Sequence, residues 1–529
     1  MSKIVTFNPE ALNKLVIGVN ILADAVGATL GPKGRNVLID TPHGVPTTTK
    51  DGVTVASFVD LKDPIENLGA QVVKQAAKKC STVAGDGTTT TTVIAQALVN
   101  ESIKLINAGV APIDIKRDFE LYLDETLDFI SLNSTPVDDN KLKDIATISA
   151  NNDEVIGTLI ADAFGKVSTE GIITVEDSRT NETYIKVVDG ISFDRGFLSG
   201  YFVTDTKKME VVYEDPYILV TDKKVRSLPE VTKALEIAVR AKRPLLIIAD
   251  EVEGQAINLM VVNKMRMGID SCAVKAPAFG MRRLEILQDL AILTGATLMS
   301  EASALSLESV EVTHLGSAKK VIVTSDSTTI ISPTGSVLEI SNRAEQLKEE
   351  LLNTTSEYDK AKLTERLAKL IAKVAVLYVG AATETELKEK KYRIDDALRA
   401  TRAAIEKGYV VGGGTLLLHA SNELNHSSLT GRVFKSALLA PIRKLLTNAG
   451  ESPDIIINDI KGNNDINFGF NAKTLQYGNL IEMGVIDPTL VVEQSLINAV
   501  SVANQLLMSD VTIYDTQPKY TPPDPNDFN

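Results

Sequence analysis

Residues Ala84 to Leu98 read AGDGTTTTTVIAQAL, a Gly-Asp-Gly turn followed by five consecutive threonines and an apolar segment. Threonine is β-branched and stiff at χ1, so helix propensity alone does not explain this run. The helical patterns VVKQAAKKCSTVAG and VIAQALVNESIKLINAG lead into and out of it. The pattern predicts a loop between two helices, with the glycines ending the first helix and the threonines opening the second.

This stretch contains the parts of a phosphate and magnesium site. Gly85 and Gly87 permit backbone conformations that turn successive N–H groups toward an anion, and the following helix N-terminus adds a positive dipole end. Thr88 to Thr90 offer hydroxyl groups, and Asp86 offers the hard oxygen ligand that Mg²⁺ prefers beside phosphates. An ordinary turn before a threonine-rich strand is the alternative, and this stretch alone leaves both readings open.

Three further loops have the same character. They are TLGPKGRN at 29–36, TTKDGVTV at 48–55 and VVGGGTLL at 410–417, each of which could also be a plain turn. Neither G-x-x-x-x-G-K-[ST] nor G-x-G-x-x-G occurs, which excludes a P-loop NTPase and a dinucleotide-binding fingerprint. Asp395-Asp396 stands in a helical pattern, and its local interpretation is a carboxylate near a helix start that favours the dipole.

Length and composition restrict the class of protein. A chain of 529 residues predicts about three domains. The 44% hydrophobic content is enough for large cores. A net charge of −14 argues against a general nucleic-acid binder, and 5% aromatic residues without tryptophan argue against stacking platforms for single strands.

Cysteine usage and hydropathy indicate a compartment. Cys80 and Cys272 form no C-x-x-C motif, and with four scattered histidines no zinc-binding spacing exists, so both thiols are expected to be small core residues. No apolar signal segment opens the chain, and no apolar run reaches the roughly 18 residues of a membrane span. We therefore expect a soluble cytoplasmic protein.

The predicted secondary structure changes twice along the chain. The first 130 residues are mainly helical, whereas ITVEDS, YIKVVDG, MEVVYED, YILVTD and PLLIIADE are short strands with helices between them. A charged helical hairpin over 342–373, turning near Thr354-Thr355, closes this α/β region, and helices then return. The fold class is multidomain α and α/β. The tail, YDTQPKYTPPDPNDFN, is predicted to be disordered.

Eight motifs in this order resemble the group I chaperonins of the bacterial GroEL type (the 60-kDa heat-shock proteins). They are TLGPKGRN, KDGVTV, GDGTTT, TISANND, VEDS, DRGFLSGYF, DDALRATRAAIEKGYVVGGG and YGNLIEMGVIDPT, and the resemblance covers residues 3 to about 515. It implies a chaperonin fold with three domains. These are a helical equatorial domain (1–132 and 408–529), a small intermediate α/β domain (133–188 and 375–407) and an apical α/β domain (189–374).

The resemblance also implies an activity. Such proteins hydrolyse ATP with Mg²⁺ and K⁺, assemble as homo-oligomeric seven-membered rings, single or stacked as two, and enclose unfolded polypeptides, some with a small co-chaperonin lid. Asp86 would hold Mg²⁺, Asp396 and Asp51 would serve catalysis, and Asp396 would position the attacking water. The implied nucleotide contacts are Thr29, Leu30, Gly31, Pro32, Lys50, Asp51, Gly52, Gly87, Thr88, Thr89, Thr90, Ile148, Ser149, Gly412, Gly413, Asn471, Ala472, Val485 and Asp487.

The client surface is expected on the apical domain, where the segment GQAINLMVVNKMRM is apolar on more than one side. A helix buried in the apical core is the alternative for part of this set. The residues that match the family's client groove are Phe197, Ser199, Tyr201, Phe202, Leu235, Ile257, Val261 and Val262.

The sequence departs from the family pattern at several places. Ala372-Lys373 replaces a hinge glycine opposite Gly190, Thr91 replaces an alanine, and Thr232 replaces a leucine of the client groove. Glu451-Ser452 stands where a Glu-Glu pair usually meets an arginine, here Arg443, across two rings, and the C-terminus lacks the Gly-Gly-Met tail. These departures fit a divergent organellar or virus-encoded copy, for which the organellar matrix or the host cytoplasm would be the location.

Three functions therefore compete. The first is an ATP-driven folding chamber, with a single-ring or lid-independent chaperonin as its variant. The second is a ring-forming structural or binding protein with a weakened cycle, against which the intact Asp51, Asp86 and Asp396 speak. The third, a small-molecule kinase, lacks a coherent substrate pocket in the pattern.

Overall fold

The computed structural model describes residues 3–40, 46–150, 153–167, 171–178, 180–206, 208–300, 303, 305–354, 356–424 and 427–515. The chain divides into two compact units. Unit 1 comprises Met1–Gly165, Asp177–Thr183 and Val379–Asn529, and unit 2 comprises Lys166–Glu176 and Tyr184–Tyr378. The chain thus leaves a helical unit, builds an α/β unit and returns. The expected intermediate segments fall mostly in unit 1, and the division into three domains stays a prediction.

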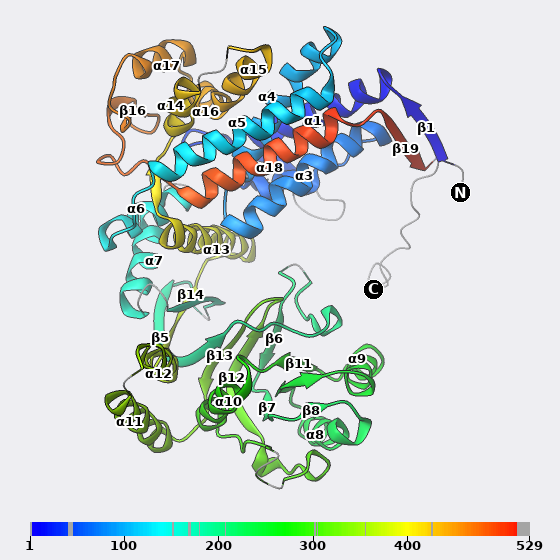
Figure 1. Ribbon diagram of the computed structural model, residues 1–529, viewed down its shortest axis with the longest axis vertical. Helices are drawn as coiled ribbons and strands as arrows, with labels where there is room; N and C mark the ends of the chain where they lie inside the picture. The colour runs from blue at the N-terminus through cyan, green and yellow to red at the C-terminus, as the bar shows by residue number, and fades with distance from the viewer. Residues whose placement is uncertain are drawn as a thin grey trace. The chain divides into compact units, whose positions relative to one another are not determined.

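Unit 1 is built mainly of helices (Figure 1). They are α1 (Glu10–Gly27), α2 (Gly52–Phe58), α3 (Pro64–Ala84), α4 (Thr88–Asn107), α5 (Pro112–Leu132), α6 (Asp139–Ser149), α7 (Glu154–Val167, which runs into unit 2), α13 (Glu384–Lys407), α14 (Thr415–Glu423), α15 (Leu429–Leu438), α16 (Ala440–Ala449), α17 (Pro453–Lys461) and α18 (Thr489–Leu507). Most of the length of α18 is buried, because it packs between α3, α4 and α5.

Unit 1 also contains short antiparallel pairs of strands. Two of them, β1 (Lys3–Phe7) with β19 (Val511–Asp515) and β15 (Tyr409–Val411) with β18 (Ile486–Pro488), join segments that are distant in the sequence. The others are β2 (Val37–Ile39) with β3 (Thr47–Thr49) and β16 (Phe468–Asn471) with β17 (Gln476–Asn479). The first pair brings the two ends of the described chain together.

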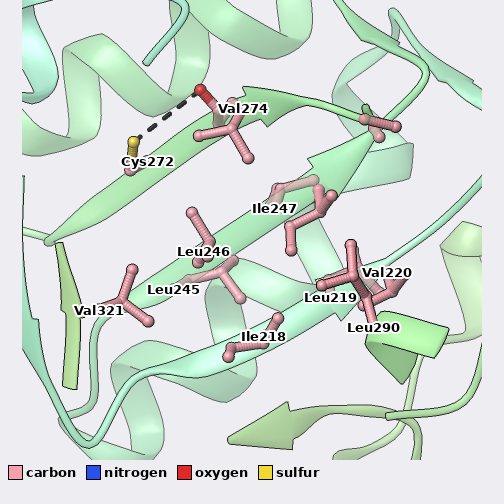
Figure 2. Packing of buried hydrophobic residues seen from close by; sticks show 14 of the residues in the cluster. Ile218, Leu219, Val220, Leu245, Leu246, Ile247, Cys272, Val274, Leu290 and Val321 are labelled. Carbon is pink, nitrogen blue, oxygen red and sulfur yellow. Dashed lines mark hydrogen bonds between the residues drawn. The ribbon is translucent and has the colours of Figure 1, made fainter. Parts of the chain in front are cut away.

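Unit 2 is organised around a sheet with the strand order β11-β9-β7-β12-β13-β5-β14-β4, and β6 also pairs with β12. Its strands β7, β9 and β11 are parallel, and their apolar side chains form the centre of the core (Figure 2). The strands are β4 (Ile172–Asp177), β5 (Tyr184–Phe193), β6 (Val211–Glu214), β7 (Tyr217–Val220), β9 (Leu245–Ala249), β11 (Ser271–Lys275), β12 (Gly316–Val323), β13 (Thr328–Pro333) and β14 (Lys373–Val379).

Helices complete unit 2. They are α8 (Leu228–Ala241), α9 (Gln255–Met267), α10 (Gly280–Thr294), α11 (Val337–Asn353) and α12 (Glu357–Leu370), with the short pair β8 (Lys224–Val225) and β10 (Glu251–Val252) and the 3₁₀ turns η1 (Gly200–Phe202), η2 (Leu307–Ser309) and η3 (Val312–His314). The five strands expected from sequence and the helices α8, α9, α11 and α12 are confirmed. The sequence predicts the hairpin turn near Thr354-Thr355, of which Thr355 lies outside the described residues. It also predicts a disordered tail from Tyr514 onward, which is wrong for Tyr514 and Asp515 because both pair with β1 as the end of β19. The rest of the tail, from residue 516, lies outside the described residues.

Two sequence expectations concern individual residues of this architecture. Cys80 and Cys272 are both free and fully buried, as expected of small core residues. Gly190 lies in β5, where an added Cβ would stand 2.5 Å from Val374 Cγ2, so close packing of β5 on β14 requires a glycine there. Among the described residues, none of the helices combines the length and the apolar character that crossing a membrane requires.

Candidate functional site

The Gly-Asp-Gly turn joins the end of α3 to the start of α4, as the sequence predicts. Helix α3 ends at Ala84, and Gly85 closes it with a φ of 81°, in the left-handed region that glycine adopts without strain. Gly87, with a φ of 90°, is the N-cap of α4. The loop therefore places Asp86 and successive backbone N–H groups at the N-terminus of a 20-residue helix, which is a setting for an anion.

Two residues that sequence reasoning missed stabilise this loop through hydrogen bonds to its backbone carbonyls. The Ser495 hydroxyl on α18 donates to the carbonyl of Gly87 over 3.3 Å, and the Cys80 thiol on α3 donates to the carbonyl of Asp86 over 3.3 Å. A Cβ on Gly87 would stand 2.4 Å from Ser495 Oγ and 2.8 Å from Cys80 Sγ. Because Ser495 is distant in sequence, no local pattern could have revealed it.

The five threonines divide into two groups. Thr91 and Thr92 are fully buried, and their hydroxyls donate back to the carbonyls of Gly87 and Thr88 over 2.8 Å. Thr88 is also buried, yet its Oγ1 has no hydrogen-bond partner in the part of the chain that the structure describes. A buried hydroxyl without a partner costs stability unless something else satisfies it, so this oxygen is available to a ligand at the start of α4.

The Lys-Asp-Gly loop packs directly against the threonines. Asp51 is the N-cap of α2, where its carboxylate accepts from the backbone N–H groups of Val53 at 3.1 Å and Thr54 at 2.8 Å. A Cβ on Gly52 would stand 2.4 Å from Thr89 Oγ1, so only glycine allows this approach. The contact brings Asp51 beside the N-terminus of α4.

The loop after α1 lies next to Lys50. The Lys50 ammonium donates to the carbonyl of Pro32 over 3.3 Å, and burial lowers the pKa of Lys50. The Asn448 amide, from α16, donates to the carbonyls of Gly27 and Leu30 at 2.9 Å and 3.0 Å. Asn448 thus fixes the Thr29–Pro32 loop, although nothing in its local sequence indicated this role.

Asp396 reaches the same place from α13, and one expectation about it is wrong. It does not start a helix: α13 runs from Glu384 to Lys407, so Asp396 stands in the middle. The helix is instead pressed against the Gly-Asp-Gly loop, because a Cβ on Gly85 would stand 2.2 Å from Arg399 Cβ and 2.7 Å from the backbone nitrogen of Ala400. Tertiary packing, rather than a helix dipole, explains this aspartate.

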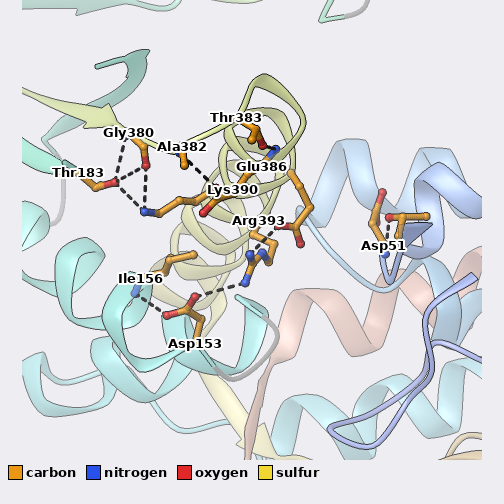
Figure 3. A network of polar contacts seen from close by, with 12 residues as sticks. Asp51, Asp153, Ile156, Thr183, Gly380, Ala382, Thr383, Glu386, Lys390 and Arg393 are labelled. Atoms are coloured by element: carbon orange, nitrogen blue, oxygen red, sulfur yellow. Dashed lines mark hydrogen bonds and ion pairs between the residues drawn. The ribbon is translucent and has the colours of Figure 1, made fainter. Parts of the chain in front are cut away.

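A network of polar contacts anchors the N-terminal half of α13 within unit 1 (Figure 3). The Arg393 guanidinium bridges Asp153 at 3.3 Å and Glu389 at 2.6 Å, and Asp153 also caps α7. The Lys390 ammonium donates to Thr183 Oγ1 at 2.8 Å and to the carbonyl of Gly380 at 3.2 Å. These contacts orient the helix that carries Asp396.

Four carboxylates share one electrostatic environment at this site. Burial, together with the charges of Asp51 and Asp86, raises the pKa of Asp396 well above its ordinary value. Desolvation by the protein packed around Asp86, together with the charge of Asp51, raises the pKa of Asp86. Its side chain is nevertheless exposed on the side that faces solvent. Burial, reinforced by Asp86, raises the pKa of Asp487 to about 6. The charges of Asp51 and Asp86 thus disfavour ionisation of Asp396, and the charge of Asp86 disfavours ionisation of Asp487. A cation bound among them would offset this repulsion.

The triple-glycine loop forms the other end of the site. The Gly412 N–H donates to the carbonyl of Val485 over 3.0 Å, and the N–H of Gly413 bonds to the carboxylate of Asp487. Strand pairing sets Val410 opposite Asp487. A Cβ on Gly412 would stand 3.0 Å from the backbone of Ile486, so this loop approaches the strand closely because it has no side chain.

The remaining expected contacts lie around this end. Asn471 and Ala472 are buried at the end of β16, where the side-chain Oδ1 of Asn471 accepts from the N–H of Lys473 over 2.9 Å. Ile148, near the end of α6, packs with Tyr409 and Ile486. Ser149 ends α6 and is half-buried, and its role stays a prediction.

The arrangement fits a magnesium ion that is bound together with phosphates. In the described part of the chain, no three Asp, Glu, His or Cys side chains come close enough to hold a metal by themselves. Mg²⁺ usually takes one or two carboxylates and completes its shell with water and substrate phosphate oxygens. The open carboxylate of Asp86, beside the unpartnered Thr88 hydroxyl, meets this requirement.

The expected client residues all lie in unit 2, but not all are accessible. Phe202 and Leu235 are buried in its core, so the expectation that they belong to an accessible client surface is wrong. Tyr201 is 65% exposed and Val262 43% exposed, whereas Phe197, Ile257 and Val261 pack partly against the core. Ser199 is half-buried and caps η1. The exposed apolar surface of α9 is extended by Met265 and Met267.

Comparison with known proteins agrees with this architecture. The chain is similar to the chaperonin gp146 from the bacteriophage EL 2 (Pseudomonas aeruginosa), whose crystal structure was obtained in the presence of ATP-BeFx. The TM-score is 0.66 at 20% sequence identity, over 97% of this chain and 99% of that one, which shows a chaperonin fold. The model of the TCP-1/cpn60 chaperonin family matches residues 22–517, nearly the whole length. This chain therefore belongs to the TCP-1/cpn60 chaperonin family, as a divergent member.

Proposed function

We propose that this chaperonin is an ATPase that uses hydrolysis to time the enclosure and refolding of non-native polypeptides. The observation that carries the proposal is the meeting of Asp86, Asp51 and Asp396, from three separate elements, at the N-terminus of α4. The fold neighbour was obtained with ATP-BeFx, which supports nucleotide binding as part of the proposal. A kinase would need a second substrate pocket beside this centre, which the sequence does not indicate.

The chain's own residues can perform phosphoryl transfer by positioning and charge. Backbone N–H groups at the start of α4, with Thr88, Thr89 and Thr90, would hold phosphate oxygens, and Asp86 would hold Mg²⁺. When bound, the metal would neutralise the negative charge on the phosphoryl group that is transferred. Lys50 and Asp51 would contact the γ-phosphate end, while Gly412, Gly413 and Asp487 would hold the nucleoside end.

Asp396 is proposed to orient the attacking water and accept its proton. A general base works best with a pKa near the working pH, and the raised pKa of Asp396 moves it in that direction. Because α13 is held to the loop through the Gly85 contact, the position of this helix would decide when hydrolysis occurs.

The assembly is proposed from the family. We propose a homo-oligomeric ring of seven subunits, with K⁺ beside Mg²⁺, acting in the cytoplasm where ATP and newly made chains are available. In this chain Arg443 is already paired with Asp454 over 2.7 Å, so its guanidinium is engaged within the subunit. That pairing favours the single-ring variant over a stacked double ring. Two further parts of this proposal are a small co-chaperonin that serves as a lid and a hinge motion of the apical domain at Gly190 and Ala372-Lys373.

The test of catalysis is Asp396→Ala, with Glu406→Ala as the matched control, since Glu406 is an exposed carboxylate on the same helix. We expect Asp396→Ala to bind ATP within about threefold of the parent and to hydrolyse it about 10²-fold more slowly, the usual loss for a general base. Glu406→Ala should behave as the parent. Unchanged turnover in Asp396→Ala would refute the role of this residue.

The test of the chaperone cycle is refolding of a chemically denatured client with ATP, compared with negative-stain electron microscopy of the same sample. ATP-dependent recovery of client activity together with seven-fold rings is the expected result, and side views count the rings. Rings without ATP-dependent refolding would instead favour the structural or binding protein.

A further inference from the structure

Unit 2 contains a cavity that is separate from the expected client surface. It has a volume of about 720 Å³ and lies between α10, α11 and α12, over residues Ile191 and Phe193 of β5. None of the expected client residues on η1, α8 or α9 lines it. Its size is that of a ligand-binding pocket rather than a packing defect.

The interior of the cavity combines apolar side chains with charges that are already paired. Ile191, Phe193 and Leu290 are buried apolar side chains of its lining. Asp289 is buried, and the guanidiniums of Arg343 and Arg366 each donate to it at 2.9 Å. These charges satisfy one another, so they hold α11 and α12 to α10 rather than waiting for a ligand.

The carboxylates that line the cavity on α11 differ from those of the interior, because they have no partner among the described residues. Glu349 and Glu350 line the cavity, both are exposed, and neither makes an ion pair or side-chain hydrogen bond within the described residues. On the opposite wall, Lys362 and Lys369 are both engaged by Glu365, at 2.8 Å and 2.9 Å. The free charge of the cavity is therefore negative, and a cationic group would complement it.

The segment Pro277–Arg282 forms an edge of the cavity and carries apolar side chains that lie beyond its lining. Ala278 and Arg282 line the cavity, and between them Phe279 is 70% exposed and Met281 is 74% exposed. Ala278 has a φ of 63°, a conformation that costs a non-glycine residue free energy and that occurs preferentially at functional sites. Two large exposed apolar side chains next to a cavity indicate an occupant that extends beyond it.

We propose that this cavity is a second polypeptide-binding site, for a segment in which an apolar side chain stands next to a lysine or arginine. The apolar side chain enters over Phe193 and Leu290, the cation pairs with Glu349 and Glu350, and the flanking residues contact Phe279 and Met281. The proposal rests on the proposed function, since the segment belongs to a non-native client. It adds a charge preference that the apolar surface of α9 does not provide.

The experiment uses the full-length protein and a fluorescent octapeptide of alternating leucine and lysine that carries a benzophenone group. After illumination, mass spectrometry locates the crosslinks. We expect crosslinks to 277–290 and 346–370, in addition to any at 255–267 on α9. In the double variant Glu349→Lys/Glu350→Lys, crosslinks to the cavity should fall about tenfold, because two favourable charge contacts become repulsive.

The matched control is Glu345→Lys, an exposed glutamate of the same helix that does not line the cavity, and it should leave the crosslinks unchanged. An octapeptide of leucine and glutamate should not crosslink to the cavity. Crosslinks confined to α9, or equal losses in both variants, would overturn the proposal. Protection of the cavity by dodecylamine at concentrations as low as those of the peptide would assign it to small amphipathic amines instead.

The two proposals can fail separately. If ATP-dependent refolding is absent but the charge-dependent crosslinks persist, the proposed function fails and the cavity remains a peptide site. If refolding proceeds normally and the crosslinks do not depend on Glu349 and Glu350, only the cavity proposal fails.

Discussion

At the scale of single residues, the site is defined by carboxylates whose negative charges repel one another. Asp487 is the clearest case, because burial and the charge of Asp86 raise its pKa to about 6. An unfolded aspartate has a pKa near 3.9, so the folded chain holds the proton more tightly than the unfolded chain. The ionised form therefore destabilises the fold above pH 6. This cost disappears as the pH falls through 6 toward 4.

We predict that Asp487→Asn stabilises unit 1 at pH 7.5 and that this gain is lost near pH 4. The expected gain is about 1 to 2 kcal/mol, after allowing for the partial exposure of the side chain. Urea unfolding monitored at several pH values measures it. The exposed Asp124→Asn on α5 serves as the control and should change stability by less than about 0.5 kcal/mol at each pH. A gain in Asp487→Asn that is independent of pH would contradict the electrostatic explanation.

At the scale of elements, the site depends on how closely α3, α4 and α13 approach. The sequence identifies all three helices, but their contact at Gly85 is a tertiary feature. Gly85 combines a left-handed φ of 81° with contact to α13, whereas Gly109, at the end of α4, has a φ of 96° and no neighbouring atom within 4 Å of an added Cβ. These two glycines therefore separate backbone conformation from close packing.

We predict that Gly85→Ala is much more damaging than Gly109→Ala. The second substitution costs only the left-handed conformation, about 1 kcal/mol, whereas the first also forces α13 away from the loop and should cost about 3 kcal/mol or more. Urea midpoints give the stabilities, and the ATPase rate reports the position of Asp396. Gly85→Ala should lower the rate at least tenfold even where the protein remains folded. Equal effects of the two substitutions would show that the contact with α13 does not matter.

At the scale of the whole molecule, the two units have separate cores, and the proposed function gives them separate roles. All the expected nucleotide contacts belong to unit 1, and all the expected client residues belong to unit 2. A ligand stabilises only the folded unit that binds it. Unfolding of a chain of this kind is not two-state, so the transitions must be resolved individually.

We predict that calorimetry of the full-length protein shows two transitions and that Mg²⁺ with a non-hydrolysable ATP analogue raises only one of them. At a ligand concentration about 100 times Kd, the stabilisation of unit 1 should be about 2.7 kcal/mol. Limited proteolysis during the scan identifies the stabilised unit by its fragments. Asp396→Ala should show the same shift because it retains binding. A shift confined to the fragments of unit 2 would contradict the assignment of the nucleotide site.

Local patterns account for most of the elements and for the glycine loops. Helical patterns in the sequence predict α3, α4, α9 and α13, and the short strand segments YIKVVDG, YILVTD and PLLIIADE predict β5, β7 and β9, because these signals arise within one element. The Gly-Asp-Gly turn and its threonines were located correctly for the same reason. The role of Asp396 was not readable locally: its dipole interpretation failed, and only the resemblance to chaperonins indicated the site.

By itself, the sequence determined the succession of elements, the family and the residues expected around a nucleotide. The tertiary structure decided which distant side chains complete the site and which candidates are accessible. Ser495 and Asn448 hydrogen-bond to the Gly-Asp-Gly loop and the Thr29–Pro32 loop from hundreds of residues away, and Phe202 and Leu235 are buried in the core. The physical reason is that helix and turn signals are local, whereas burial and hydrogen bonding between remote segments arise only when the chain packs.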